Sequence, residues 1–407
     1  GELAPADVLA LASGAVVAVA TVAGAPLSHA SIVARSLGMP TVTGLGPELL
    51  QIPEGTVVLV DGDAGRVHVD PAPDEVRAAR ARRRAADRDR EAARALAAGP
   101  ARTLDGAAVT VLANVGGADE ARRAVAEGAD GIGMLRTEFA FLGRAEPPGE
   151  EEQYDAYRGV AEAVAGRPLI VRTLDLGADI PAWGGAAEPN PALGNRGIRF
   201  ALASPGLLDT QLRAIARLAD ERPVQVMFPM VTTVDELRRA RARLDAVGAA
   251  RAGPRAAPEP EVGITVEVPA AALTADAFAP LVDFFAVGSN DLTQYTLAAD
   301  RANAAVAAIA DGLHPAVLRL IGHVAEAGRR HGRPVEVVGE LASDPAAVPV
   351  LLGLGVAVLS VRPNAVAGVK HAVRHAHLGR ARELAASALG AESAGAVRRM
   401  ALDAGGR

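Results

Sequence analysis

The chain has 407 residues, half of them hydrophobic and only 3% aromatic, and its 42 Lys and Arg against 48 Asp and Glu give a formal net charge of −6. This length predicts two domains, and the acidic balance argues against a general nucleic-acid-binding protein. The absence of cysteine excludes disulfides, thiolate metal sites and a cysteine nucleophile, and no apolar run approaches the roughly 20 residues of a membrane span.

Residues 1–73 predict a small α/β domain. A short helix is predicted at Ser28–Leu37, with His29 in its first turn. The free amides and the dipole at such a helix start favour a bound phosphate, and the dipole also disfavours imidazolium, which keeps the ring neutral and nucleophilic. Taken alone, His29 is more often an ordinary residue of a helix start. The predicted strands are Val16–Val22, Thr41–Thr43, and a hairpin of Val57–Val60 and Arg66–Val69.

Residues 74–104 predict a helical linker. Arg, Glu, Asp and Ala dominate from Asp74 to Ala98, a composition of good helix formers with few apolar anchors. Acidic residues are interleaved with the arginines, so a solvated helix is favoured over an RNA-binding arm. We expect this segment to be a hinge between two domains.

Residues 105–407 predict a (β/α)₈ TIM barrel. Strand-like runs alternate with helical stretches over about 300 residues, a normal length for this fold. A doubly wound sheet is the structural alternative. The predicted strands are Val109–Val115, Gly131–Leu135, Leu169–Arg172, Val224–Met230, Val262–Glu267, Phe284–Gly288, Val335–Val338 and Ala357–Val361.

Polar and charged residues collect where these predicted strands end, which is where barrels of this type carry their chemistry. Guanidinium groups grip phosphate and carboxylate through paired hydrogen bonds, so several arginines at one rim predict a small polyanionic ligand. Carboxylates alone would repel that ligand and therefore imply Mg²⁺ or Mn²⁺ between them and it. The alternative is a set of ion pairs that only closes the rim. The residues are Arg136, Arg172, Asp175, Glu267, Asn290, Asp291, Arg301, Glu340 and Arg362.

Sequence motifs along nearly the whole chain resemble one family. The segment Gly24–Arg35 (GAPLSHASIVAR) is similar to the phosphohistidine signature shared by enzyme I of the sugar phosphotransferase system, pyruvate phosphate dikinase and phosphoenolpyruvate synthase. The barrel segments resemble enzyme I, and the end of the last one favours enzyme I over the dikinases. These segments are GMLRTEF at 133–139, VRTLD at 171–175, MFPM at 227–230, VEVPAA at 266–271 and GSNDLTQYTLAADR at 288–301.

The resemblance implies a reaction and a set of roles. His29 would accept the phosphoryl group of phosphoenolpyruvate through Nε2, pyruvate would be released, and the phosphate would pass to a carrier protein of the HPr type. Glu267 and Asp291 would bind Mg²⁺ (or Mn²⁺). A swivel at the linker, a homodimer formed through the barrel and a cytoplasmic location are also implied. The implied substrate-binding residues are Arg136, Arg172, Arg196, Asn290, Asp291 and Arg301.

Four positions depart from the family pattern. Val338 stands where the family places a cysteine that protonates the enolate carbon, so the formation of pyruvate is the step in question. Leu27 replaces a usual Thr, Ile180 a common Lys, and Arg362 a small residue. The chain also aligns after the carrier-binding helical domain, so we expect weak transfer to HPr.

These departures leave two alternatives to an enzyme I-like phosphotransferase. One is a non-catalytic regulator that binds phosphoenolpyruvate. The other is a dikinase-like enzyme, which would need an ATP-grasp domain that this sequence does not contain.

Overall fold

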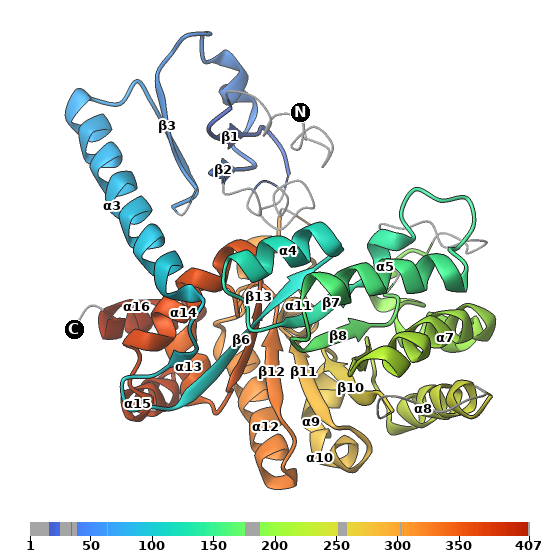
Figure 1. The fold of residues 1–407 in the computed structure, drawn as a ribbon. Coiled ribbons are helices and arrows are strands. Elements are labelled where there is room, and N and C mark those ends of the chain that lie inside the picture. The colour runs from blue at the N-terminus through green and yellow to red at the C-terminus, as the bar shows by residue number, and fades with distance from the viewer. Residues whose placement is uncertain are drawn as a thin grey trace. The chain divides into compact units, whose positions relative to one another are not determined.

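The computed structural model describes residues 16–24, 34, 39–62, 64–175, 188–250, 259–301, 303 and 305–405. The chain forms two compact units, one of residues 1–95 with 297–311 and the other of residues 96–296 with 312–407 (Figure 1). The predicted domain boundaries at residues 73 and 104 stay predictions. No helix within the described ranges combines the length and the apolar character that crossing a bilayer requires.

The N-terminal unit contains two small pairs of strands. The strand β1 (Val19–Ala20) runs parallel to β2 (Thr41–Val42), and β3 (Val58–Asp61) forms the predicted hairpin with β4 (Arg66–Val69). The first strand is shorter than the predicted run of residues 16–22, because its partner offers only two residues for pairing. The predicted helix, apart from Ala34, lies outside the described residues, as do His29 and Leu27.

The predicted linker helix is α3 (Pro73–Ala97), which has acidic residues in its first turn. These residues complement the positive end of the helix dipole. The chain just beyond α3 is fixed by the fully buried Lys370 on α14 (Val366–His375). Its Nζ donates to the carbonyl oxygens of Ala97 at 3.0 Å and Gly99 at 3.2 Å, and pairs with Asp130 Oδ1 at 2.6 Å. The end of the helix is therefore anchored to the barrel by charge-assisted bonds.

The second unit is a closed barrel of parallel strands, as predicted. Neighbouring strands pair in sequence order from β6 to β13, and β13 pairs with β6 to close the ring. Because a doubly wound sheet leaves two open edges, this closure rules that alternative out. The short β5 (Ala101–Arg102) pairs antiparallel with β6. The barrel strands are β6 (Ala108–Val115), β7 (Ile132–Arg136), β8 (Leu169–Arg172), β9 (Gln225–Phe228), β10 (Glu261–Val266), β11 (Phe284–Gly288), β12 (Val335–Val338) and β13 (Val358–Val361).

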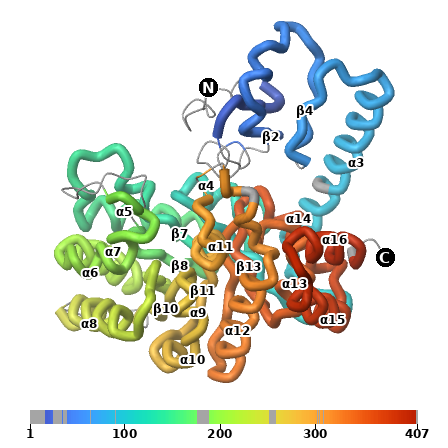
Figure 2. Tube along the Cα trace, turned by 180° about the vertical axis from the view of Figure 1, so that it is seen from behind, coloured from blue at the N-terminus to red at the C-terminus, as the bar shows by residue number. Residues whose placement is uncertain are grey.

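Helices follow the strands and cover the outside of the barrel (Figure 1). Their starts follow ordinary capping rules: in α8, Thr233 and Glu236 form a capping box. The helices α13, α15 and α16 lie side by side near the C-terminus (Figure 2). The helices are α4 (Ala118–Ala126), α5 (Glu150–Ala163), α6 (Ile198–Ala203), α7 (Pro205–Glu221), α8 (Val234–Ala249), α9 (Pro269–Leu273), α10 (Ala275–Phe278), α11 (Ser289–Leu297), α12 (Pro315–His331), α13 (Val348–Gly353), α15 (Leu378–Leu389) and α16 (Ala394–Gly405).

The inside of the barrel is packed rather than hollow. One buried cluster joins five side chains from the strands β8, β9, β11 and β12, with Met134 of β7 packed against it. A Cβ placed on Gly263 would lie 2.3 Å from the ring of Phe284, so the ring requires glycine at that position. A filled interior of this kind leaves the chemistry to the strand ends and the loops beyond them. The cluster consists of Ile170, Met227, Phe284, Ala286 and Val338.

Candidate functional site

Arg172 is the last residue of β8 and lies between two carboxylates. Its Nη2 donates to Glu138 Oε1 at 3.0 Å, and its Nη1 is 3.4 Å from Asp175 Oδ2. Burial works against the charged guanidinium, but Glu138, Asp175 and Glu267 together hold the pKa of Arg172 above its ordinary value. The buried Nε of Arg172 has no hydrogen-bond partner among the described residues. The side chain is therefore a fixed cation with an N–H group still to be satisfied.

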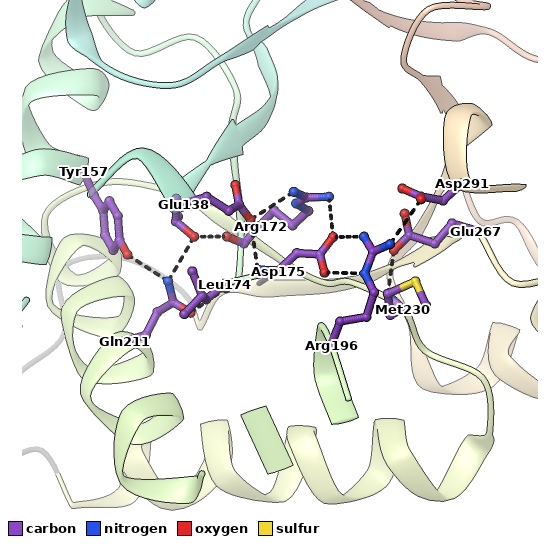
Figure 3. Close-up of polar contacts among 11 residues, drawn as sticks. Glu138, Tyr157, Arg172, Leu174, Asp175, Arg196, Gln211, Met230, Glu267 and Asp291 are labelled. Atoms are coloured by element: carbon purple, nitrogen blue, oxygen red, sulfur yellow. Dashed lines mark hydrogen bonds and ion pairs between the residues drawn. The ribbon is translucent and has the colours of Figure 1, made fainter. Parts of the chain in front are cut away.

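Arg196 contacts both Asp175 and Asp291 and so connects two parts of the site (Figure 3). It binds Asp175 in a bidentate manner, with Nη2 to Oδ2 at 2.7 Å and Nε to Oδ1 at 3.2 Å. Its Nη1 also donates to Asp291 Oδ1 at 3.3 Å and to the Tyr295 hydroxyl at 3.2 Å. Arg196 therefore ties the loop after β8 to the first turns of α11. The side chain is only 8% exposed, so its charge is needed to neutralise both carboxylates.

Glu267 follows β10 and lies where its neighbours only partly compensate the negative charge of an ionised carboxylate. Its Oε1 accepts the backbone N–H of Met230 at 2.6 Å, and the residue is 2% exposed. Burial, together with the nearby carboxylates of Asp291 and Asp175, raises the pKa of Glu267 to about 8. The guanidinium groups of Arg172 and Arg196 act in the opposite direction but do not cancel this effect.

The raised pKa of Glu267 shows that the site lacks positive charge, which bears on whether Glu267 and Asp291 fit a divalent cation. A cation between them would relieve the repulsion that raises the pKa of Glu267. No group of three or more His, Asp or Glu side chains in the described parts of the chain is arranged to hold a metal ion. Two protein carboxylates, with the other ligands from water and a substrate phosphate, are what Mg²⁺ commonly uses. The donor set therefore fits Mg²⁺ bound together with an anionic ligand.

Arg136 ends β7 and is paired in register with Arg172 on the neighbouring strand. Its guanidinium carbon lies 5.1 Å from the centre of the Phe139 ring, and its Nη2 is 3.7 Å from Glu120 Oε2. The buried Nε of Arg136 has no hydrogen-bond partner in the described ranges. Two adjacent arginines that each retain an unsatisfied N–H are suited to a phosphate or carboxylate.

The ends of β11, β12 and β13 are joined by polar contacts around Asn290. Its Oδ1 accepts the backbone N–H of Glu340 at 3.1 Å. Next to it, Ser289 donates its hydroxyl to the carbonyl oxygen of Val338 at 2.8 Å. Glu340 in turn is 3.4 Å from the Nε of Arg362. The added cation at position 362 therefore lies beside a carboxylate of the rim.

A buried chain of hydrogen bonds holds the backbone directly after Arg172, on both sides of Thr173 (Figure 3). Gln211 on α7 accepts the N–H of Leu174 at 2.8 Å and donates to the Tyr157 hydroxyl at 2.9 Å. It also donates to Thr137 Oγ1 at 3.2 Å, and that hydroxyl donates to the carbonyl oxygen of Arg172 at 3.0 Å. Supporting bonds of this kind keep a site residue in one orientation.

The structure brings several of the predicted site residues together, whereas others belong to the other unit or lie outside the described residues. Arg172, Asp175, Arg196, Glu267 and Asp291 lie in one network, with Arg136 and Asn290 on the neighbouring strand ends. Arg301 belongs to the segment 297–311 of the other unit, while His29 and Ile180 lie outside the described residues. The roles of all these residues stay predictions.

Sequence reasoning missed Glu138 and Tyr295 as members of the network. Glu138 receives both the Arg172 guanidinium and the N–H of Asp175 at 2.9 Å. The available signal was an acidic residue two positions after Arg136, at a strand end already rich in charge. Tyr295 gave no such signal, because only the fold brings its hydroxyl to Arg196.

Two family descriptions match the chain. Residues 90–378 match "PEP-utilising enzyme, PEP-binding domain", and residues 1–65 match "PEP-utilising enzyme, mobile domain". A solved structure of an aldolase/citrate lyase family protein from Burkholderia cenocepacia covers 72% of this chain and 96% of its own, with a TM-score of 0.40 and 19% identity. That likeness is too distant to bear on function.

The curated relatives are much closer. The chain is 44% identical over 398 residues to a phosphoenolpyruvate-protein phosphotransferase of Streptomyces coelicolor, covering 97% of this chain and 69% of that protein. It is 43% identical over 399 residues to the one of Haloferax volcanii, covering 96% and 69%. It is 44% identical over 411 residues to a multiphosphoryl transfer protein of Xanthomonas campestris, covering 98% of this chain and 47% of that protein. The chain thus spans about half the length of the multiphosphoryl transfer protein.

Proposed function

Because the chain belongs to the phosphoenolpyruvate-utilising enzymes, and within them to the phosphoenolpyruvate-protein phosphotransferases, we propose that it transfers a phosphoryl group from phosphoenolpyruvate to His29. The observation that supports this proposal is the network of Arg172, Asp175, Arg196 and Asp291 around the strand ends. It offers buried cations together with a partly neutralised carboxylate, Glu267. A phosphorylated carboxylic acid with a bound cation is the ligand that complements such charges.

In this proposal the barrel holds the donor. The unsatisfied N–H groups of Arg136 and Arg172 bind its anionic oxygens, and the amide of Asn290 and the side chain of Arg301 complete the grip. Arg196 keeps Asp175 and Asp291 in place, and Glu267 and Asp291 hold Mg²⁺ or Mn²⁺. The cation, when bound, neutralises charge on the phosphate. The contribution of the chain is to position the donor and to compensate its charge, which is most of what phosphoryl transfer requires.

The acceptor step follows from the chemistry of a neutral imidazole. His29 Nε2 attacks phosphorus, the P–O bond to the enol oxygen breaks, an N–P bond forms, and the enolate of pyruvate leaves. The enolate then takes a proton at C3 to become pyruvate. Because donor and acceptor belong to different predicted domains, the proposal requires a swivel at α3. Onward transfer to an HPr-type carrier, a homodimer through the barrel and a cytoplasmic location complete this proposal.

One observation favours a second candidate function, a regulator that binds phosphoenolpyruvate without turnover. Val338, where the resemblance implies an acid, is buried in the apolar cluster and has no proton to give. The regulator would bind the donor at the same arginines and would leave His29 unmodified.

Incubation of the chain with ³²P-phosphoenolpyruvate and Mg²⁺ separates the two functions. We expect an alkali-stable, acid-labile label, because a phosphoramidate on imidazole has that stability. The label should be absent from His29→Ala and unchanged in His331→Ala, a matched control whose partly exposed ring pairs with Asp276. Binding of phosphoenolpyruvate without any label on the wild-type chain would establish the regulator instead.

A further inference from the structure

Glu336 is a buried acidic residue inside the barrel, and it has no role in the proposed phosphoryl transfer. It is the second residue of β12 and is only 3% exposed. Both of its side-chain oxygens are shielded from solvent, and neither has a hydrogen-bond partner among the described residues. A buried polar group without partners is costly and uncommon in a native protein. Its presence in the barrel interior therefore calls for a role.

The strand register shows how close Glu336 comes to the site. Val338, two residues further along β12, is paired with Gly288 on β11 and with Ser360 on β13, which places all three in the row just inside the rim. The backbone of Glu336 is one row deeper. Its side chain nevertheless extends toward Ser360, because a Cβ placed on Gly133 would be 3.0 Å from Glu336 Oε2 and 2.3 Å from Ser360 Oγ. The two oxygens border the same small space.

Two features of β7 and β13 keep that space open and polar. The pairing of β7 with β6 and with β8 is irregular around Gly133, and a Cβ there would clash with Ser360 Oγ and crowd Glu336 Oε2. Ser360 donates its hydroxyl to Asn114 Oδ1 at 2.5 Å. Irregular pairing next to a glycine is how sheets make room beside active sites.

Burial is the only cause that shifts the titration of Glu336, and it raises the pKa well above the ordinary value. Its register partners, Ala286 on β11 and Val358 on β13, are uncharged, and so are Gly133 and Ser360. Burial therefore favours the protonated form of the carboxyl group, and no nearby cation stabilises the carboxylate. A carboxyl group kept protonated in this way can act as an acid.

We infer that Glu336 supplies the proton that converts the enolate of pyruvate to pyruvate. The inference rests on the proposed function, which creates an enolate above the row of Val338. In the step, the O–H bond of Glu336 breaks, a C–H bond forms at C3 of the enolate, and the electron pair of the O–H bond stays on the carboxylate. Solvent then returns the proton to Glu336. The step is favourable because the enolate carbon is a far stronger base than a carboxylate, even one raised by burial.

The inference is tested by the stereochemistry of the methyl group. Phosphoenolpyruvate that carries deuterium at one C3 position is turned over in tritiated water. A proton delivered by a fixed acid reaches one face of the enolate and gives a chiral methyl group, whereas ketonisation of released enolpyruvate in water gives a racemic one. We expect a chiral methyl group from the wild-type chain and at least a tenfold loss of chirality in Glu336→Gln.

Several controls separate this role from a structural one. The rate of ³²P labelling of His29 should change less than twofold in Glu336→Gln, because the proton is needed only after transfer. Glu336→Met should give the same racemic product and a raised melting temperature, because it removes a buried group without partners. Glu336→Asp should retain part of the chirality. Glu261→Gln, a change at an exposed carboxylate at the start of β10, should alter nothing.

The outcomes are distinct for the inference and for the proposed function. A wild-type chain that carries no label overturns both. A labelled chain whose methyl group is racemic, or remains chiral in Glu336→Gln and Glu336→Met, overturns the role of Glu336 alone. A loss of labelling that matches the loss of chirality also overturns it, because Glu336 would then act before the enolate forms.

Discussion

Replacing Glu267 with glutamine is expected to lower the rate of phosphoryl transfer from phosphoenolpyruvate by at least about 10²-fold while leaving the metal-free protein at least as stable as the wild type. A neutral amide is a poor ligand for Mg²⁺, so the charge compensation that the cation gives the phosphate is lost. Without metal, Glu267 is held against the carboxylates of Asp291 and Asp175, and removing its charge relieves that repulsion. The rate is measured as initial ³²P labelling at saturating Mg²⁺, and stability as the melting temperature in EDTA.

The raised pKa of Glu267 should also make the free energy of unfolding depend on pH. The folded-state pKa of Glu267, about 8, is higher than the 4.5 of a free glutamate. The folded protein therefore binds the extra proton between those values, and the free energy of unfolding in EDTA falls as pH rises from about 4.5 to about 8. The advantage of Glu267→Gln over the wild type should grow across that range.

The matched control is Glu261→Gln, which makes the same change at an exposed carboxylate bonded to Gln225. It should affect neither activity nor the slope of stability with pH. A Glu267→Gln chain that labels His29 at the wild-type rate in Mg²⁺ would show that the cation is not held where we propose.

Replacing Arg196 with methionine is expected to lower the free energy of unfolding by about 3–5 kcal/mol, the usual cost of removing one partner from a buried ion pair. The change leaves Asp175 and Asp291 without the guanidinium that both contact. Methionine fills much of the same volume, so the loss reports charge rather than packing. The measurement is urea unfolding in EDTA, followed by circular dichroism.

Two further variants test whether the loss comes from the buried charges. Asp175→Asn in the Arg196→Met background should recover part of the loss, because it removes a buried carboxylate that has lost one of its two guanidinium partners. Arg243→Met breaks a pair with Asp209 whose arginine is 37% exposed, and should cost no more than about 1 kcal/mol. If Arg196→Met and Arg243→Met prove equally mild, the bridge does not hold the site together.

Much of the barrel could be predicted because each strand is a short apolar run of the kind that parallel sheets bury on both faces. The closing pair β13 and β6, in contrast, joins residues about 250 positions apart, and no local pattern indicates it. The first strand was predicted too long, because hydrophobicity continues beyond the two residues for which β2 provides partners.

The site residues likewise divide into those that the local sequence pattern indicates and those that it does not. Arg172 and Glu267 were found because they are charged residues at the ends of apolar runs. Arg196 came only from the resemblance, and its contacts with Asp175, Asp291 and Tyr295 give it a bridging place in the network. Glu336 escaped notice, because an acid within a strand ordinarily faces solvent, and only the fold shows that its side chain is buried beside Gly133 of β7.

Isothermal titration calorimetry of phosphoenolpyruvate into the His29→Ala chain tests the central claim most directly, because this variant can bind the donor but cannot consume it. We predict one molecule bound per chain in the presence of Mg²⁺, with an affinity at least about 10²-fold lower in EDTA and in Arg172→Met. Equal affinity with and without the divalent ion, or an unchanged affinity in Arg172→Met, would contradict the account.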